Sequence, residues 1–212
     1  SSICALSKKV GISSMEEWLV SKTPVKLGGI APGNATDDVP KILQAGIGLP
    51  IHFVSGYKGT SEVRLAVEGG EVFGVCMGWD SIRPTWRKLL DSGEVVIVVQ
   101  ATARPHPDLP RVPLAFNLAK TQEGRRLIEV GIQDMSAIFR PYVLPPGVPK
   151  DRLEALRHAF VETLKDTEFL AAAEKSRLSI DPVSGEEVKK IVSGLFELPP
   201  SLVAKLKETL KW

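Results

Sequence analysis

The chain has 212 residues, of which 43% are hydrophobic and 25% are charged, and its formal net charge is +2. A chain of this length and composition can bury one large hydrophobic core or two small ones. Positive and negative charges are mixed along the sequence without a basic stripe, which argues against a nucleic-acid partner. No stretch approaches the roughly 20 apolar residues of a membrane-spanning helix.

Strand-like and helical segments alternate through the first half of the sequence. The β-branched run at residues 95–99 has no polar alternation, which is typical of a strand covered on both faces. This pattern predicts an α/β fold with a parallel-type sheet. The expected strands are residues 3–6, 25–27, 51–54, 72–77, 95–101 and 138–144. The expected helices begin near Ser14, Asp37 or Asp38, Ser61, Thr85 and Gln122.

The composition becomes helical beyond residues 145–149, whose sequence Pro-Pro-Gly-Val-Pro is the strongest interruption in the chain. Four apolar residues then recur at helical spacing and predict a helix with an inward-facing stripe. They are Leu153, Leu156, Phe160 and Leu164. Further helices are expected after Asp166, after Ser184 and after Pro199.

Two glycine-containing turns each follow an expected strand and open an expected helix. They are residues 28–36, Gly-Gly-Ile-Ala-Pro-Gly-Asn-Ala-Thr, and residues 55–60, Ser-Gly-Tyr-Lys-Gly-Thr. A helix N-terminus presents free N–H groups and the positive end of a dipole, so it can hold an anion without lysine or metal. The glycine spacing matches neither a dinucleotide fingerprint nor a P-loop. Two interpretations stay open: ordinary βα turns, or two sides of a pocket for a carboxylate or phosphate.

Other polar residues give weaker signals. Trp79 and Asp80 follow an expected strand end, where open α/β sheets bind ligands, although packing explains a tryptophan there as well. Asp37 and Asp38 could form a catalytic or metal-binding pair, but acidic residues are also expected at a helix start. The three histidines are scattered, and no nucleophile motif or zinc spacing occurs. We therefore expect no catalytic constellation, no metal and no cofactor.

Cys4 and Cys76 are the only cysteines. Two cysteines can be buried thiols in a reducing compartment or one disulfide in an oxidising compartment. The spacing of the pair does not choose between these alternatives.

An ordered set of short motifs runs through nearly the whole chain. The set comprises Gly28-Gly29 through Pro32-Gly33, Gly56-Tyr57-x-Gly59, Ala66-x-x-x-Gly70-Glu71, Asp108-Leu109-Pro110-x-Val112-Pro113, Arg140-Pro141, Pro145-Pro146-Gly147-Val148-Pro149, Leu156-Arg157-x-Ala159-Phe160, Lys165-Asp166-x-Glu168-Phe169 and Pro182-Val183-Ser184-Gly185-Glu186-Glu187. It resembles the tripartite tricarboxylate transporter receptor family, the TctC or Bug-type periplasmic solute-binding proteins. The resemblance implies a two-lobed α/β fold like the type II periplasmic binding proteins, with the ligand between the lobes.

The resemblance also implies a function: capture of a di- or tricarboxylate, a related organic acid, or an amide or amino acid, for delivery to the membrane subunits of a transporter. It implies a periplasmic location, no enzymatic activity, and a disulfide between Cys4 and Cys76. The ligand-binding residues carried over are Ala31, Gly33, Asn34, Ala35, Thr36, Tyr57, Gly59, Thr60, Ser61, Trp79 and Asp80. Two departures affect ligand identity: Asn34 stands where the family usually has serine, and Lys58 where it has proline.

Relative to the family, the sequence begins at the crossing into the second lobe. Residues 3–136 are expected to form that inserted lobe with its carboxylate-binding loops, and residues 137–212 the mostly helical C-terminal part of the first lobe. The N-terminal residues lack the features of a signal peptide, so the periplasmic location rests on the resemblance. We expect weak or undetectable ligand binding by this chain alone, and self-association through an exposed apolar face of the C-terminal segment.

Two alternative functions come from other classes of protein. The first is an enzyme that acts on a small anionic substrate, which would have to use Asp37, Asp38, Glu62 or Asp80 as its reactive groups. The second is a regulatory or interaction module, derived from a binding protein, that binds a protein partner and ignores acids.

Overall fold

The structure is a computed structural model that describes residues 1–176, 178 and 180–211. It divides into two compact units, one made of Ser1–Ser136 with Leu198–Trp212 and the other of Ala137–Glu197. The sequence predicts one division after residue 136, and the structure adds a second one after residue 197.

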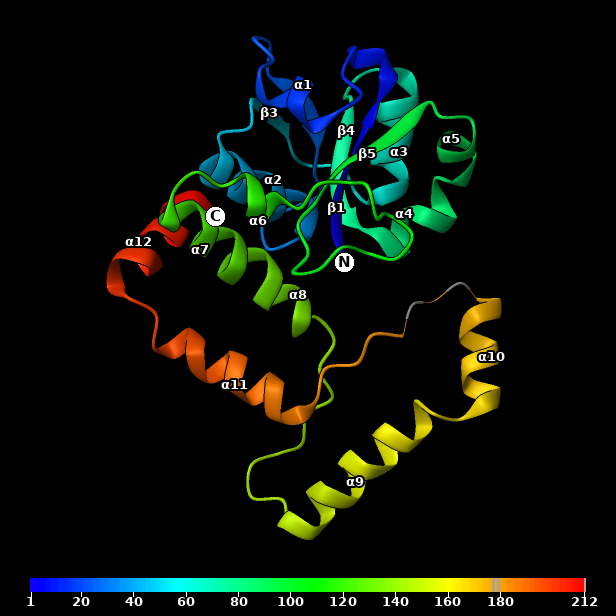
Figure 1. Cartoon of the computed structure of the whole chain (residues 1–212), viewed down its shortest axis with the longest axis vertical. Helices are drawn as coiled ribbons and strands as arrows, with labels where there is room; N and C mark the ends of the chain where they lie inside the picture. The colour runs from blue at the N-terminus through cyan, green and yellow to red at the C-terminus, as the bar shows by residue number, and fades with distance from the viewer. Residues whose placement is uncertain (177, 179, 212) are drawn as a thin grey trace. The chain divides into compact units, whose positions relative to one another are not determined.

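Five strands of the described chain form one sheet in the first unit, in the order β3-β2-β4-β1-β5 (Figure 1). The strands are β1 (Ser2–Ser7), β2 (Val25–Gly28), β3 (Ile51–Val54), β4 (Gly74–Gly78) and β5 (Val95–Gln100). Strand β2 is parallel to β3 and β4, whereas β1 is antiparallel to β4 and β5. The α/β class is confirmed, but the expected parallel-type sheet is mixed because β1 pairs in the reverse direction between β4 and β5.

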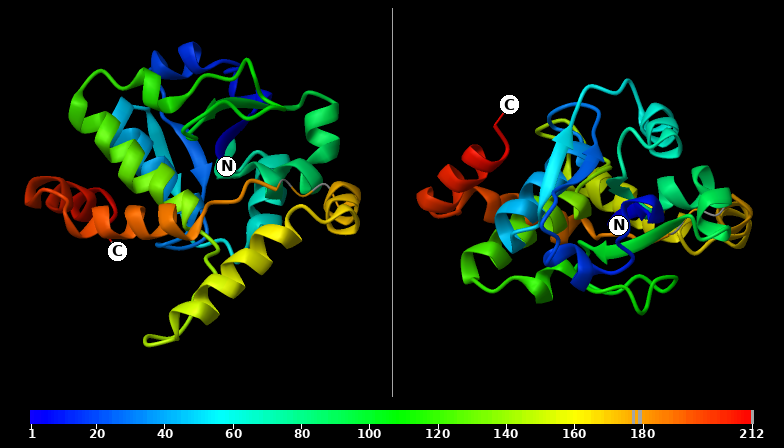
Figure 2. Two further views of the ribbon diagram at one scale, coloured as in Figure 1. Left: turned by 60° about the horizontal axis from the view of Figure 1, so that its bottom comes forward. Right: turned by 90° about the horizontal axis from the view of Figure 1, so that it is seen from above.

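Helices cover both faces of this sheet, as the views in Figures 1 and 2 show. Helices α3 (Thr60–Gly69), α4 (Trp79–Thr85) and α5 (Arg87–Asp91) lie on one face. There, Val63, Val67, Ile82 and Trp86 pack in one core cluster with side chains of β1 and β4 such as Ile3 and Val75. Helices α2 (Ala35–Ile47) and α7 (Gln122–Ile128) pack together on the other face. Each fully buried aliphatic side chain stabilises this arrangement by roughly 1.5–3 kcal/mol.

Helix α2 begins earlier than the sequence suggests. Its first residue is Ala35, and the Asn34 side chain caps it, so Asp37 and Asp38 fall inside the first turn instead of starting the helix. Pro40 consequently lies beyond the first turn, inside the helix, where proline is ordinarily disfavoured. The apolar face is as predicted, since Val39, Ile42 and Leu43 are all buried.

The remaining elements of the first unit are short. They are η1 (Lys8–Val10), α1 (Met15–Leu19), α6 (Ala115–Leu118), the π-helical segment η2 (Glu129–Asp134) and α8 (Met135–Ala137). Ser14 caps α1 by accepting the Glu17 N–H, as its spacing predicts. The single helix expected near Thr85 is two helices, α4 and α5, and the helix expected from Gln122 continues through η2 into α8.

The last helix, α12 (Pro200–Thr209), packs on α2 and α7 of the first unit. Leu202 is buried, and a side chain at Gly131 of η2 would come within 3.2 Å of the Leu206 side chain. In the structure α12 thus belongs to the same compact unit as the sheet, while residues 137–197 form the other unit.

The second unit holds α9 (Lys150–Thr163), α10 (Thr167–Lys175) and α11 (Gly185–Phe196). The strand expected at 138–144 is absent from these described residues, which run without regular structure. The stripe expected to face inward is not buried: Leu156 and Phe160 are exposed, at 53% and 40%, and Leu153 and Leu164 are half-buried. Within the described residues of this unit only Ala173 is buried, so it has almost no hydrophobic core of its own. No helix in the described chain is long and apolar enough to cross a membrane.

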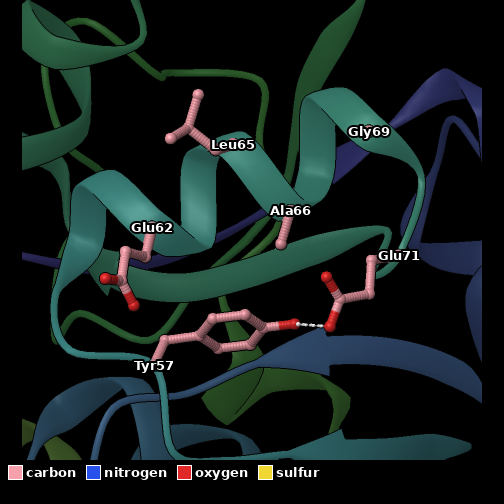
Figure 3. A pocket seen from close by; sticks show the side chains of 6 residues that line it. All are labelled: Tyr57, Glu62, Leu65, Ala66, Gly69 and Glu71. Atoms are coloured by element: carbon pink, nitrogen blue, oxygen red, sulfur yellow. Dashed lines mark hydrogen bonds between the residues drawn. The ribbon is translucent and has the colours of Figure 1, made fainter.

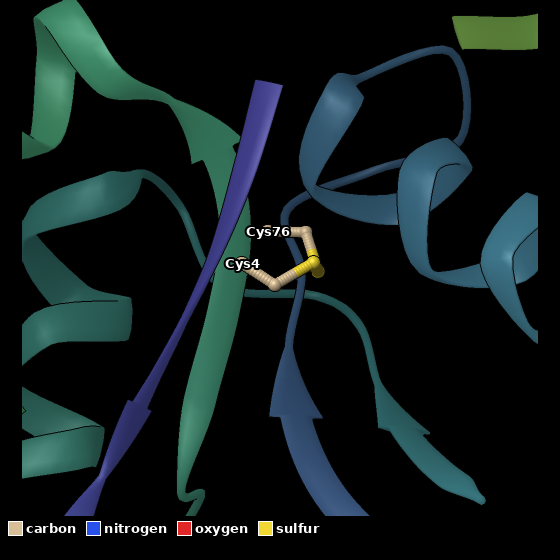
Figure 4. Close-up of a disulfide and its surroundings, with 2 residues drawn as sticks. All are labelled: Cys4 and Cys76. Atoms are coloured by element: carbon tan, nitrogen blue, oxygen red, sulfur yellow. A yellow bond between two sulfur atoms is a disulfide. The ribbon is translucent and has the colours of Figure 1, made fainter. Parts of the chain in front are cut away.

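Cys4 and Cys76 form a disulfide, drawn in Figure 4. The two residues lie directly opposite each other in the antiparallel pair β1–β4, with Cα atoms 4.0 Å apart, and both are fully buried. The disulfide closes a loop across a sequence separation of 72. Restricting the unfolded chain by a loop of that size stabilises the folded state by about 4 kcal/mol.

Candidate functional site

The two glycine-containing turns lie side by side because they follow neighbouring parallel strands. We call residues 29–34, after β2, the first turn, and residues 55–59, after β3, the second turn. The Gly29 N–H donates to the Val54 carbonyl at 2.8 Å, and the Tyr57 N–H donates to the Gly29 carbonyl at 3.2 Å. The topology thus joins two segments that are some 25 residues apart in the sequence.

The chain leaves these two turns in opposite directions. The first turn leads into α2 on one face of the sheet, and the second leads into α3 on the other face. A crevice opens at the carboxyl ends of parallel strands where consecutive connections diverge in this way, and open α/β sheets bind their ligands there. Trp79 and Asp80 follow β4, on the other side of β2, so all three predicted segments lie at the same edge of the sheet.

The first turn uses most of its polar groups internally. The Asn34 side chain accepts the Thr36 N–H at 3.2 Å, and Asp38 accepts the Gly33 N–H at 3.3 Å. Desolvation by burial raises the pKa of the Asp38 carboxyl, while the Gly33 N–H opposes that shift. Asp37 is fully buried and accepts the Ile30 N–H at 2.7 Å. Side chains of the chain itself therefore occupy the anion-binding end of α2.

Helix α3, which follows the second turn, has an open N-terminus. Its N-cap residue is Gly59, and no side chain caps it. The Gly59 carbonyl accepts the N–H groups of Glu62 and Val63. In the chain as described, by contrast, the Thr60 and Ser61 N–H groups donate no hydrogen bond. Glu62 bonds back to the Lys58 N–H at 2.9 Å instead of covering these donors.

The Tyr57 side chain lies below α3 and points toward Glu71 (Figure 3). Its hydroxyl donates to Glu71 at 2.8 Å, and desolvation together with this carboxylate raises the pKa of Tyr57 to about 12. The ring borders an open hollow of about 400 Å³, whose other lining residues are Glu62, Leu65, Ala66, Gly69 and Glu71. Two carboxylates line this hollow and Tyr57 is its only predicted site residue, so it does not suit an acidic ligand.

Trp79 and Asp80 are engaged in contacts of their own. Trp79 is 7% exposed, and its indole N–H donates to Asp108 at 3.0 Å. Asp108 also pairs with Arg83 at 2.9 Å, while Asp80 lies 4.0 Å from the amino group of Ser1. The sequence places Asp108 in one of the ordered motifs but does not indicate that it will contact Trp79 and Arg83.

The structure thus brings together two of the three predicted segments, the two turns, and places Trp79–Asp80 at the same sheet edge in a packed environment. The sequence assigns no role to two further residues. The Ser55 hydroxyl donates to Asp37 across the two connections, and the Ile30 N–H donates to Asp37 within the β2–α2 connection. His52 and His158 are exposed. The described residues contain no group of three or more histidine, cysteine, aspartate or glutamate side chains that could hold a metal ion.

No family model matches the sequence, and no curated protein sequence matches it. Solved structures do resemble the fold. A TctC solute-binding protein from Polaromonas, solved without ligand, superimposes with a TM-score of 0.67 at 12% identity. A Rhodopseudomonas palustris protein solved with adipate gives 0.60 at 15% identity, and MatC from the same organism, with bound malate, gives 0.60 at 16% identity.

These matches cover 96–99% of this chain but only 64–66% of each solved structure. The chain therefore spans just under two thirds of their length. At such low identity the likeness establishes the fold alone. It confirms the expected α/β architecture, and this chain corresponds to a part of the solved structures.

Proposed function

We propose that this chain is part of an extracytoplasmic solute-binding protein that captures a small organic acid for a tripartite tricarboxylate transporter. The observation that carries the proposal is the open N-terminus of α3, where the Thr60 and Ser61 N–H groups have no acceptor in the described chain. Two adjacent N–H groups at the positive end of a helix are suited to one carboxylate. The R. palustris structures of the same fold contain adipate and malate, which are both dicarboxylates.

In this proposal the two turns have different tasks. The second turn binds a ligand carboxylate through Thr60 and Ser61, whose hydroxyls add further hydrogen-bonding capacity. The first turn forms the neighbouring wall of the site. It offers the ligand few hydrogen-bond donors, because side chains of Asn34 and α2 already accept the N–H groups of Ile30, Gly33 and Thr36. Asn34 supports this division, because its amide caps α2 from within.

The Cys4–Cys76 disulfide supports an extracytoplasmic location, because buried structural disulfides persist in oxidising compartments such as the periplasm. The intact protein would close two lobes on the ligand, a change that the ligand drives by binding the closed state more tightly. The present chain provides one wall of such a site, so we expect its affinity for citrate, malate or adipate to be millimolar. Micromolar or tighter binding in calorimetry would contradict this expectation.

A proline substitution tests the role of the α3 N-terminus directly. Thr60→Pro removes one of the two donors yet is compatible with the helix, because proline is favoured at the first helical position and Gly59 is already extended. Thr167→Pro is the matched control, since Thr167 is the first residue of α10 in the other unit. We expect saturation-transfer NMR signals of malate or adipate with the unaltered chain and with Thr167→Pro, and their loss with Thr60→Pro. Equal signals from the two variants would contradict the proposal.

A further inference from the structure

We infer that Asp37 is a positioning residue that fixes the second turn against the first, and so sets the orientation of the Thr60 and Ser61 N–H groups. The effect on ligand rests on the proposed function, whereas the mechanical coupling of the turns does not. Asp37 is the third residue of α2, the helix that follows the first turn, and its side chain is fully buried.

The two oxygens of the Asp37 carboxylate serve different turns. Oδ2 accepts the Ile30 N–H at 2.7 Å and the Thr36 hydroxyl at 3.1 Å, both from the β2–α2 connection. Oδ1 accepts the Ser55 hydroxyl at 2.5 Å, from the start of the second turn. Hydrogen bonds to an ionised carboxylate are roughly twice as strong as neutral ones. One buried group therefore holds both turns by its strongest contacts.

Gly29 is the residue that allows this approach. A side chain there would place its Cβ 2.5 Å from Oδ2 of Asp37 and 2.3 Å from the ring of Phe53, which is closer than real contacts permit. Gly29 also forms both backbone hydrogen bonds between the turns. The absence of a side chain at Gly29 thus leaves room for the Asp37 carboxylate, which lies where a Cβ atom would otherwise be.

This arrangement has a consequence for the ligand. The N-terminus of α2 already has a negative group of the chain itself, so a second carboxylate placed there would be repelled. The first turn of α3 also contains a carboxylate, Glu62, but it accepts the Lys58 N–H and leaves the first two N–H groups of the helix uncovered. Because Asp37 occupies donors beside α2, the donors left for a ligand carboxylate are those of α3, which Asp37 helps to hold in place.

The most selective test removes only the link between the turns. Ser55→Ala deletes the hydroxyl that binds Oδ1 and leaves the contacts of Asp37 to Ile30 and Thr36. Ser92→Ala is the matched control, because it removes a serine hydroxyl that bonds locally to Leu89 and Glu94, remote from both turns. In the ligand-free chain, we expect Ser55→Ala to speed amide hydrogen exchange of residues 56–61 about tenfold. Exchange at Ile42 and Leu43 of α2 should not change in either variant.

A second variant tests whether the effect of Ser55→Ala arises from its hydrogen bond to Asp37. Asp37→Asn keeps the size of the side chain but leaves one acceptor oxygen for donors in both turns. It should speed exchange of residues 56–61 as Ser55→Ala does, and the double variant should add little, because both changes break one link. Unchanged exchange in Ser55→Ala, or additive effects in the double variant, would overturn the inference.

Ligand binding separates the inference from the proposed function. If the unaltered chain binds malate, Ser55→Ala should weaken that binding about fivefold or more while Ser92→Ala leaves it unchanged. If the unaltered chain binds neither malate nor adipate at millimolar concentrations, the assignment of a ligand carboxylate to the N-terminus of α3 fails, and the exchange experiment still decides the role of Asp37.

Discussion

The two turns at the edge of the sheet both precede a helix N-terminus, but they differ in which groups accept the N–H donors there. In the first turn, Asn34, Asp37 and Asp38 accept N–H groups of the connection itself. In the second turn, Gly59 offers no side chain, and the first two N–H groups of α3 remain without acceptors in the described residues. The contrast shows that a glycine-containing turn before a helix indicates an anion site only where the chain has not already supplied its own anion.

The largest expected effect is on the stability of the whole fold, and it should not change the difference between the two turns. Replacing both cysteines, as Cys4→Ala with Cys76→Ala, should lower the free energy of unfolding by about 4 kcal/mol, because it releases the unfolded chain from a long loop. Denaturant unfolding measures this change. Since the disulfide joins β1 and β4 and neither cysteine belongs to a turn, amide exchange in both turns should rise together. A rise confined to one turn would show that the disulfide supports that turn specifically.

A matched pair of glycine substitutions should separate the turns. Gly29→Ala should destabilise the protein by about 2–3 kcal/mol, since its Cβ has no room beside Phe53 and Asp37. Gly59→Ala should change stability by less than about 0.5 kcal/mol, because nothing lies within 4 Å of a Cβ there and its φ of 179° is extended backbone. Equal losses in urea unfolding would contradict the proposed difference in packing.

Changing the caps should convert one turn toward the other. Asn34→Ala removes the acceptor for the Thr36 N–H and should cost about 1 kcal/mol of stability. Gly59→Asn supplies the cap that α3 lacks and should stabilise the chain by a few tenths of a kcal/mol. Because the new side chain would occupy the helix donors, Gly59→Asn should also weaken malate binding in NMR titrations. Stronger binding by this variant would count against α3 as the carboxylate site.

The last expected effect is confined to high pH and concerns Tyr57. Its pKa is raised to about 12 from an ordinary value of 10.0, first by desolvation and then by Glu71. The folded state therefore holds this proton more tightly than the unfolded state, so the resulting stability is complete below pH 10 and is lost as the pH rises to 12. The ultraviolet difference titration between the unaltered chain and Tyr57→Phe should show a phenol that ionises near pH 12. Glu71→Gln should lower that midpoint, and an unchanged midpoint would remove Glu71 as a cause.

Local sequence signals predicted both turns and much of the sheet. Glycine positions marked the ends of β2 and β3, and the strand at Ile51–Val54 has the predicted bounds. Helical periodicity also identified the buried face of α2, because apolar spacing depends only on nearby residues.

Long-range features could not be predicted in this way. The reversed direction of β1 depends on its pairing with strands some 70 to 90 residues away. The apolar stripe of α9 has the right spacing, but periodicity does not say whether anything in the chain covers it. The contact between Asp37 and Ser55 likewise arises only when two turns meet. An aspartate at position 37 is already expected near a helix N-terminus. Its additional hydrogen bond to Ser55 therefore leaves no separate signal in the sequence.

The most direct test of the central claim is an amide chemical-shift titration of the isotopically labelled chain with malate. We expect saturable shifts of the Thr60 and Ser61 N–H signals at millimolar malate, with the Ile30, Gly33 and Thr36 signals nearly unmoved. Sodium chloride at equal ionic strength controls for screening. Shifts concentrated in the first turn, or none in either turn, would contradict the claim that the open end of α3 binds the ligand carboxylate.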